Sequence, residues 1–155
     1  MKDKLLVCTF SGGRTSAFMG LMLKDLPKYK DFKKVFIFAN TGKELPQTLD
    51  FINKCDQEWD LNIVWLEANV IYEKGIGTNF KIVDYKTASR NGEPFEDMLK
   101  KYPLPNNMAS NCTRELKLAP INKYVKSLGY KEVYTAMGIR FDERHRESNT
   151  AEQQK

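Results

Sequence analysis

Short apolar runs alternate with amphipathic stretches along this chain, and the alternation predicts a regular order of strands and helices. Apolar runs with few charges indicate buried strands over residues 5–10, 34–40, 62–68 and 132–139. Apolar positions at helical spacing indicate helices over residues 17–23, 46–59, 93–102 and 121–128. The first of these helices is apolar almost all round, which is typical of a buried helix.

The order of these elements indicates the fold class. Strand, helix, strand, helix, strand predicts an α/β protein with a doubly wound parallel sheet of about four to five strands and helices on both faces. Residues 70–92 carry a weaker pattern, that of a loop with a short strand near residues 80–85. At 155 residues the chain has the length of one domain, which we place at residues 1–147. The polar run over residues 148–155 is expected to be disordered.

A glycine turn joins the first strand to the first helix. Its residues are Ser11, Gly12, Gly13, Arg14, Thr15 and Ser16. Glycines let backbone N–H groups approach a ligand closely, and the first turn of a helix has N–H groups without helical partners. Three hydroxyl groups and one guanidinium add to this donor set. The turn is therefore predicted to bind an anion, and phosphate is the expected one.

The spacing of this turn differs from those of a Walker A loop and a dinucleotide fingerprint. It resembles the pyrophosphate loop Ser-Gly-Gly-x-Asp-Ser of the PP-loop superfamily, with Thr15 at the position of the Asp. These adenine nucleotide alpha hydrolase-like proteins, of HUP-like fold, include ATP pyrophosphatases, phosphoadenosine phosphosulfate (PAPS) reductases and sulfurtransferases. The resemblance implies that residues 11–16 hold the phosphates of a nucleotide.

Two further segments resemble those of PAPS reductase relatives at the ends of strands. Asn40, Thr41 and Gly42 stand where the relatives have Asp-Thr-Gly-x-Glu, and are implied to flank the nucleoside. Asn40 replaces the carboxylate but still donates and accepts hydrogen bonds. The last predicted strand ends in a stretch similar to the relatives' Gly-Ile-Arg-x-x-Glu. Its residues, implied to line the nucleotide site, are Gly138, Ile139, Arg140 and Glu143.

A fourth segment carries the candidate catalytic residues Cys112, Arg114 and Lys117. Arg114 and Lys117 are three positions apart, so on an α-helix they project from one face and could clamp an anionic group. Relatives have a similar Cys-x-x-Arg-x-x-Lys-x-x-Pro element, with the Arg one position farther from the Cys. Cys112 is a nucleophile if the two cations lower its pKa, and otherwise an inert structural thiol.

The resemblance implies an enzyme similar to PAPS reductases, in a short form like those encoded by bacteriophages, but three functions stay open. The first is a reductase-like enzyme that binds an adenine nucleotide and acts at its phosphate or sulfate end. The second is an ATP pyrophosphatase or adenylating sulfurtransferase that acts on a nucleic-acid base. The third is a degenerate nucleotide-binding module, which the replacements at Thr15 and Asn40 favour.

Composition indicates the cellular compartment and the kind of ligand to expect. Three well-separated cysteines, Cys8, Cys55 and Cys112, indicate a reducing compartment and supply too few thiolates for an iron–sulfur cluster within one chain. No apolar run is long enough to span a membrane and no signal peptide is visible, so we expect a cytoplasmic protein, in the host cytoplasm if a phage encodes it. The net charge of +5 is compatible with nucleotides or nucleic acid.

The expected cofactor is an adenine nucleotide, PAPS or ATP, and Mg²⁺ is compatible with it although the sequence offers no dedicated metal site. Besides this nucleotide, the expected partner is a sulfur donor or a thioredoxin-like reductant. Nucleic acid is a further candidate partner. A homodimer is expected if a sheet edge needs covering.

Overall fold

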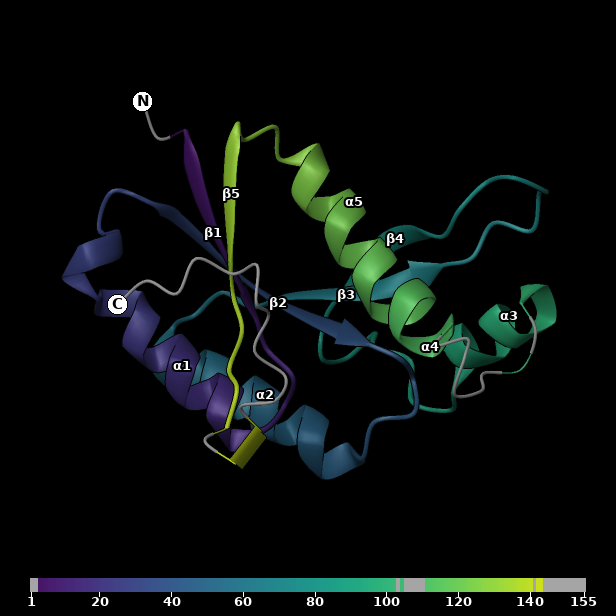
Figure 1. Cartoon of the computed structure of the whole chain (residues 1–155). Coiled ribbons are helices and arrows are strands. Elements are labelled where there is room, and N and C mark those ends of the chain that lie inside the picture. Colours follow the sequence, from purple (N-terminus) through teal and green to yellow (C-terminus); the bar gives the residue numbers. More distant parts are fainter. Residues whose placement is uncertain (1–2, 103, 105–110, 141, 144–155) are drawn as a thin grey trace.

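A mostly parallel five-stranded sheet forms the centre of the computed structural model, which describes residues 3–102, 104, 111–140 and 142–143 (Figure 1). The strands are β1 (Lys4–Thr9), β2 (Lys33–Asn40), β3 (Val64–Asn69), β4 (Asn79–Val83) and β5 (Glu132–Ala136). Their order across the sheet is β4-β3-β2-β1-β5, and only β4 runs antiparallel to its neighbour. The predicted α/β class and strand number are confirmed.

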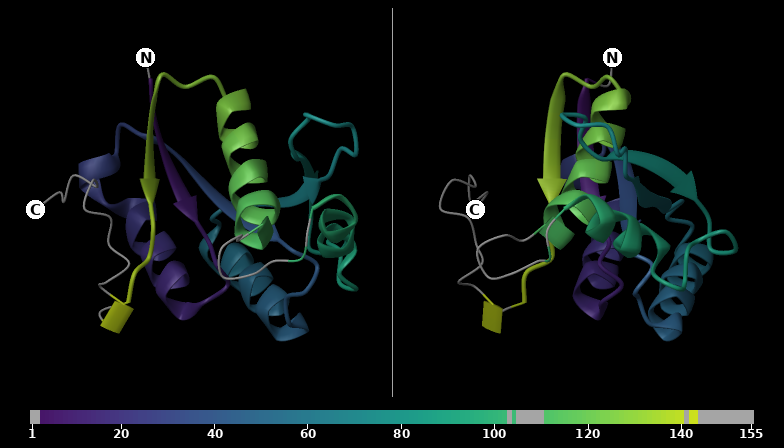
Figure 2. Two further views of the ribbon diagram at one scale, coloured as in Figure 1. Left: turned by 45° about the vertical axis from the view of Figure 1, so that its right-hand side comes forward. Right: turned by 90° about the vertical axis from the view of Figure 1, so that its right-hand side faces the viewer.

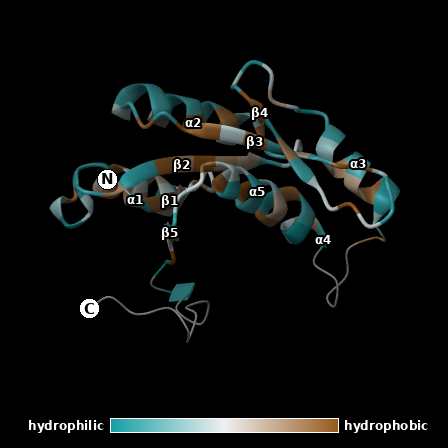
Figure 3. Cartoon of the chain, turned by 90° about the horizontal axis from the view of Figure 1, so that it is seen from above, coloured by the Kyte–Doolittle hydropathy of each residue, from teal (hydrophilic) through white to brown (hydrophobic). Residues whose placement is uncertain are grey.

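Helices cover both faces of this sheet. The helices α1 (Arg14–Asp25) and α2 (Pro46–Trp59) cover one face and α5 (Ala119–Ser127) covers the other, whereas α3 (Glu93–Lys101) and the single turn α4 (Asn111–Thr113) lie beside the end of β3 (Figure 2). A 3-10 turn, η1 (Pro27–Tyr29), follows α1, and a π-helical segment, η2 (Arg114–Leu118), leads into α5. Figure 3 shows α2 and α5 on opposite sides of the sheet, as a doubly wound fold requires.

The alternation of side chains along β1 explains how one strand contributes to two hydrophobic cores. Leu6 and Cys8 point to the face covered by α1 and α2, whereas Leu5 and Val7 point to the face covered by α5. All four side chains are at most 3% exposed. A smaller third cluster, around Met98 and Leu116, packs α3 and η2 beside the end of β3. The apolar run of β1 is therefore buried on both faces, as its sequence predicts.

The prediction that α1 is buried all round is wrong. Only Ser16, Ala17 and Gly20 are buried, while Phe18 is 64% and Met22 51% exposed. A helix packed on one face of a sheet buries one side only, and α1 has no second layer of described structure over its outer side. The apolar residues there form an exposed surface.

The prediction of a buried strand over residues 132–139 is also corrected. The strand ends at Ala136, and Val133 is 45% exposed, because β5 is the last strand in the sheet and α5 packs over β2, β3 and β4 instead. Among the described strands, β5 pairs with β1 alone. This open edge is where the expected homodimer would form, and the homodimer stays a prediction. The second sheet edge is β4, close to the short strand predicted near residues 80–85.

The polar tail over residues 148–155 lies outside the described residues, so its predicted disorder stays a prediction. In the part of the chain that the structure describes, no helix is long and apolar enough to cross a membrane.

Gly20 offers a test of how α1 packs on the sheet. A Cβ added there would lie 3.6 Å from a ring carbon of Phe36 and 3.7 Å from one of Phe10, which is ordinary van der Waals contact. Since glycine in a helix interior costs about 0.5–1 kcal/mol relative to alanine, we expect Gly20→Ala to raise the free energy of unfolding by this amount in urea denaturation. Gly20→Leu should lower it, because the larger side chain has no room. Stabilisation by both would contradict the close packing.

Candidate functional site

A cleft of about 800 Å³ opens at the carboxyl ends of β1, β2 and β5. The chain goes from β1 to β2 on one side and returns to β5 on the other, so the cleft lies where the strand order reverses, the usual ligand site of such sheets. Four segments line it: Thr9, Phe10, Ser11, Gly13, Arg14, Thr15 and Ser16 after β1; Ile37, Phe38 and Ala39 in β2; Thr113, Lys117, Leu118 and Ile121 around η2; Met137, Gly138, Arg140 and Glu143 after β5. Its volume is that of a small-molecule site.

Hydrogen bonds hold the glycine turn of residues 11–16 in place. The hydroxyl of Ser16 donates to the Gly13 carbonyl at 2.9 Å and accepts from the backbone N–H of Ser11 at 3.1 Å. The first helical backbone bond of α1 runs from the N–H of Ala17 to the Gly13 carbonyl. The preceding N–H groups, from Arg14 to Ser16, therefore remain as first-turn donors, and all three residues line the cleft. The predicted anion-binding turn is formed by backbone geometry.

Gly12 allows this turn to approach α2 closely. Its φ of +81° is in the left-handed region, and a Cβ added to it would lie 2.5 Å from Cγ2 of Thr48 and 3.2 Å from Cδ1 of Ile52. A side chain is thus excluded by both conformation and space. Gly12 does not itself line the cleft but lets the turn pass closely over α2.

The segment after β5 meets the glycine turn directly. The position of a Cβ on Gly138 would lie 3.3 Å from Cγ2 of Thr15, so these two cleft residues are in close contact. Beyond Gly138, the Arg140 guanidinium pairs with the carboxylate of Asp142 and stays largely exposed. This pairing raises the pKa of Arg140. Ile139, unlike Gly138, Arg140 and Glu143, is not among the residues that line the cleft.

The structure separates the three candidate catalytic residues. Lys117 lines the cleft, but Arg114 and Cys112 do not. The π-helical hydrogen-bond pattern of η2 widens the turn, so the α-helical rule that residues three apart share a face fails here. Cys112 instead packs at the cluster around Met98 and Leu116.

Arg114 is held in a separate polar cluster. Its Nε donates to Oε1 of Glu115 at 2.8 Å, and its terminal nitrogen donates to Oδ1 of Asn111 at 2.8 Å. Oε2 of Glu115 accepts from the Thr78 hydroxyl at 2.5 Å. Burial alone would raise the pKa of Glu115, but the hydrogen bonds from Thr78 and Arg114 outweigh it and lower this pKa. The cluster ties η2 to the start of β4.

The turn after β2 lies beside the cleft. Ala39 lines the cleft, whereas the fully buried Asn40 directs its amide to protein partners and accepts from the N–H of Gly42 at 3.2 Å. Gly42 has φ +78°, and a Cβ on it would lie 2.9 Å from Cδ of Pro94. The Thr41 hydroxyl donates to the carboxylate of Glu44 at 3.1 Å.

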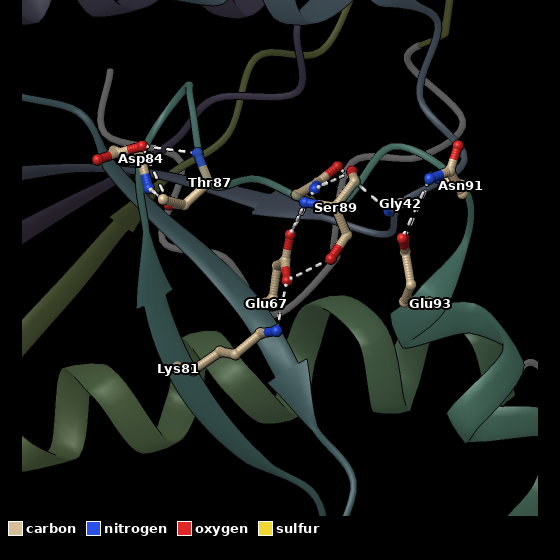
Figure 4. Close-up of polar contacts among 9 residues, drawn as sticks. Gly42, Glu67, Lys81, Asp84, Thr87, Ser89, Asn91 and Glu93 are labelled. Carbon is tan, nitrogen blue, oxygen red and sulfur yellow. Dashed lines mark hydrogen bonds and ion pairs between the residues drawn. The ribbon is translucent and has the colours of Figure 1, made fainter.

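Sequence reasoning missed one charged residue at this rim, Glu67 of β3. Figure 4 shows its carboxylate between Ser89 and Lys81. A single carboxylate inside an otherwise apolar strand, at residues 64–68, was a usable signal, because burying it requires partners.

Charges around the cleft favour an anionic ligand. Arg14, Lys117 and Arg140 line it from three separate segments, and Glu143 is the acidic residue among its lining. Phe10 and other apolar side chains of the strand ends make up much of the remaining wall. Within the described ranges, no three His, Cys, Asp or Glu side chains are grouped so as to hold a metal ion.

Comparisons with known proteins agree with this geometry. Residues 5–155 match the model of the phosphoadenosine phosphosulfate reductase domain family. The chain belongs to this family. The match covers all four segments that line the cleft.

Two curated relatives extend the comparison. The chain is 34% identical over 142 residues to the uncharacterized nin region protein ORF290 of Escherichia phage lambda, covering 88% of this chain and 48% of the relative. It is 30% identical over 139 residues to the uncharacterized protein MJ0973 of Methanocaldococcus jannaschii, covering 90% of this chain and 26% of the relative. The chain thus spans half or less of the length of these relatives. No solved structure matches it significantly.

The two neighbouring glycines of the turn provide a matched test. We expect Gly12→Ala to destabilise the protein by about 1–3 kcal/mol, because the new Cβ combines backbone strain with a clash against α2. Gly13→Ala should be tolerated, since Gly13 has φ −95° and its Cβ position is 3.6 Å from the nearest atom, Oγ of Ser11. Thermal denaturation of both variants measures the difference. Equal melting temperatures would disprove the contact with α2.

The three thiols should differ in reactivity. Burial raises the pKa of Cys8 to about 12, and it also raises the pKa of Cys55. Cys112 is less buried than either of them. We expect iodoacetamide at pH 8 to alkylate Cys112 first, as measured by peptide mass spectrometry, because reaction needs an accessible thiolate. Labelling of Cys8 in the native protein at a similar rate would contradict this order.

Proposed function

We propose that the cleft binds an adenine nucleotide, PAPS or ATP, and that the protein acts at its phosphate or sulfate end. The observation that carries the proposal is the convergence of the α1 N-terminus with three cations on one cleft. Backbone N–H groups and guanidinium or ammonium groups are the donors that phosphates prefer. The membership of the family supports the same ligand class.

The lining suggests how such a nucleotide would lie. The phosphates would bind at residues 11–16, with Lys117 and Arg140 neutralising the distal anion. The exposed apolar side chains of Leu118 and Met137 offer surface for the nucleoside. Glu143 is the lining carboxylate that could contact Mg²⁺ if the metal accompanies the nucleotide.

A reductase-like reaction needs a thiol that accepts the sulfonate group. Cys8, Cys55 and Cys112 do not belong to the described lining of the cleft. We therefore propose that a thioredoxin-like reductant supplies this thiol, whereas a sulfur donor would be the partner in the alternative sulfurtransferase reaction. An exposed cleft mouth, flanked by the largely exposed Arg140, is compatible with such a partner.

Calorimetric titration with ATP, PAPS and adenosine 3′,5′-bisphosphate, with and without Mg²⁺, tests the proposal. We expect Lys117→Ala to weaken binding about ten- to a hundredfold, since a hydrogen bond to a charged group contributes about 1.5–3 kcal/mol. Lys123→Ala is the matched control, because it removes an equal charge from α5 outside the cleft lining.

The outcomes of this titration separate the candidate functions. Tighter binding of PAPS than of ATP supports the reductase-like function, and a preference for ATP with Mg²⁺ supports adenylation chemistry. Binding without turnover, with any sulfur donor, would indicate a nucleotide-binding module. Absence of binding for all three nucleotides would refute the proposed function.

A further inference from the structure

Glu67 is a buried carboxylate outside the cleft lining. It lies in β3, between β2 and β4, and its side chain is fully buried. Burying an ionised carboxylate is costly unless hydrogen bonds and opposite charge compensate. Its position near the carboxyl end of β3 places it beside the rim formed by the end of β2, where it faces Asn40.

Four donors surround the two oxygens of this carboxylate. Oε1 accepts from Nδ2 of Asn40 at 2.7 Å and from the backbone N–H of Ser89 at 2.6 Å. Oε2 accepts from the Ser89 hydroxyl at 3.0 Å and lies 3.0 Å from Nζ of Lys81. Figure 4 shows Lys81 and Ser89 approaching Glu67 from opposite sides. Since every partner donates, the acceptor-only carboxylate form satisfies all of them.

The same contacts determine which way the Asn40 amide points. Its nitrogen faces two acceptors, Oε1 of Glu67 and the Ser89 carbonyl at 2.8 Å. Its oxygen is thereby directed to the N–H of Gly42, from which it accepts a hydrogen bond at 3.2 Å. A flipped amide would face two acceptors with its oxygen and lose all three bonds. Glu67 thus orients the side chain that closes the turn after β2.

Packing leaves this turn little freedom to adjust. The Cβ position of Gly42 is 3.0 Å from the Cα of Gly92 and 2.9 Å from Cδ of Pro94. Ala39, directly before Asn40, lines the cleft. The turn is therefore closely packed between the cleft and the residues that begin α3.

We propose that Glu67 is a positioning residue of the nucleotide site: it requires an amide at position 40 and, through it, holds the turn at Thr41 and Gly42 against the rim. The proposal rests on the proposed function for the ligand of the site. It also accounts for Asn40 standing where the similar motif has Asp. A carboxylate at position 40 would face the Glu67 carboxylate and the Ser89 carbonyl, with no donor between them.

A double-mutant cycle between positions 40 and 67 tests the proposal. We expect Asn40→Asp to weaken nucleotide binding at least tenfold and to accelerate hydrogen exchange of the Gly42 amide. Glu67→Gln should weaken binding by less than Asn40→Asp, because its amide oxygen can still accept from Asn40 and Ser89 while its nitrogen would face the Lys81 ammonium. In the double variant the introduced amide can donate to the introduced carboxylate, so the loss should be smaller than for Asn40→Asp alone. Additive losses would overturn the proposal.

Two further variants keep the test decisive. Asn40→Ala covers the case in which Asn40→Asp does not fold, because Glu67 retains Ser89 and Lys81; it should also speed Gly42 exchange at least tenfold. Lys86→Ala is the control, since it removes an equal charge from an exposed position outside the contacts of Glu67. A lower melting temperature for Asn40→Ala with unchanged Gly42 exchange and unchanged nucleotide affinity would mean a structural role only, and would refute positioning.

The exchange measurement also separates the two proposals. If wild-type protein binds no nucleotide, the proposed function fails, yet Gly42 exchange in the Asn40 variants still reports whether Glu67 and Asn40 hold the turn. If wild-type protein binds and Asn40→Asp binds equally well, the positioning role fails while the proposed function stands.

Discussion

The burial of β1 on both faces is the constraint on which the rest of the structure depends. Its alternate side chains enter two different cores, so helices must pack on both sides of the sheet. Because β2 pairs on one edge of β1 and β5 on the other, the strand order reverses at β1. The cleft at the carboxyl end of β1 follows from this topology.

The proposed anion site shows how many hydrogen-bond donors the backbone supplies before any charged side chain is counted. Gly12 lets the chain pass over α2, and the Ser16 hydroxyl closes the turn, which leaves first-turn N–H groups at the cleft. None of this requires the carboxylate that Thr15 replaces. Thr15 instead contacts Gly138, so the substitution lies where the two loops meet. Phosphate binding and the loss of that carboxylate are compatible for this reason.

Local sequence determined the strands, the glycine turn and the helices well, because each depends on patterns within about fifteen residues. Prediction from local sequence failed where the structure depends on residues that are distant in the chain. The apolar run of β5 looked buried, yet strand order places it at an edge. The spacing of Arg114 and Lys117 predicted that both project from one face of a helix. In the π-helical turn, Arg114 instead hydrogen-bonds to Glu115 and Asn111, and Lys117 alone of the two lines the cleft. A π-helical turn has no simple signature in the sequence.

The Asn40 and Glu67 pair illustrates why a motif cannot be interpreted one position at a time. Viewed alone, Asn40 is a motif position that has lost its carboxylate, which favours a degenerate site. In the fold, the same position faces a buried carboxylate from the neighbouring strand, and an amide is the side chain that supplies both a donor for Glu67 and an acceptor for Gly42. Lys81 and Ser89 stabilise the carboxylate of Glu67 on its other side. An amide at position 40 therefore fits its surroundings, and the departure from the motif does not by itself indicate a site that has lost its function.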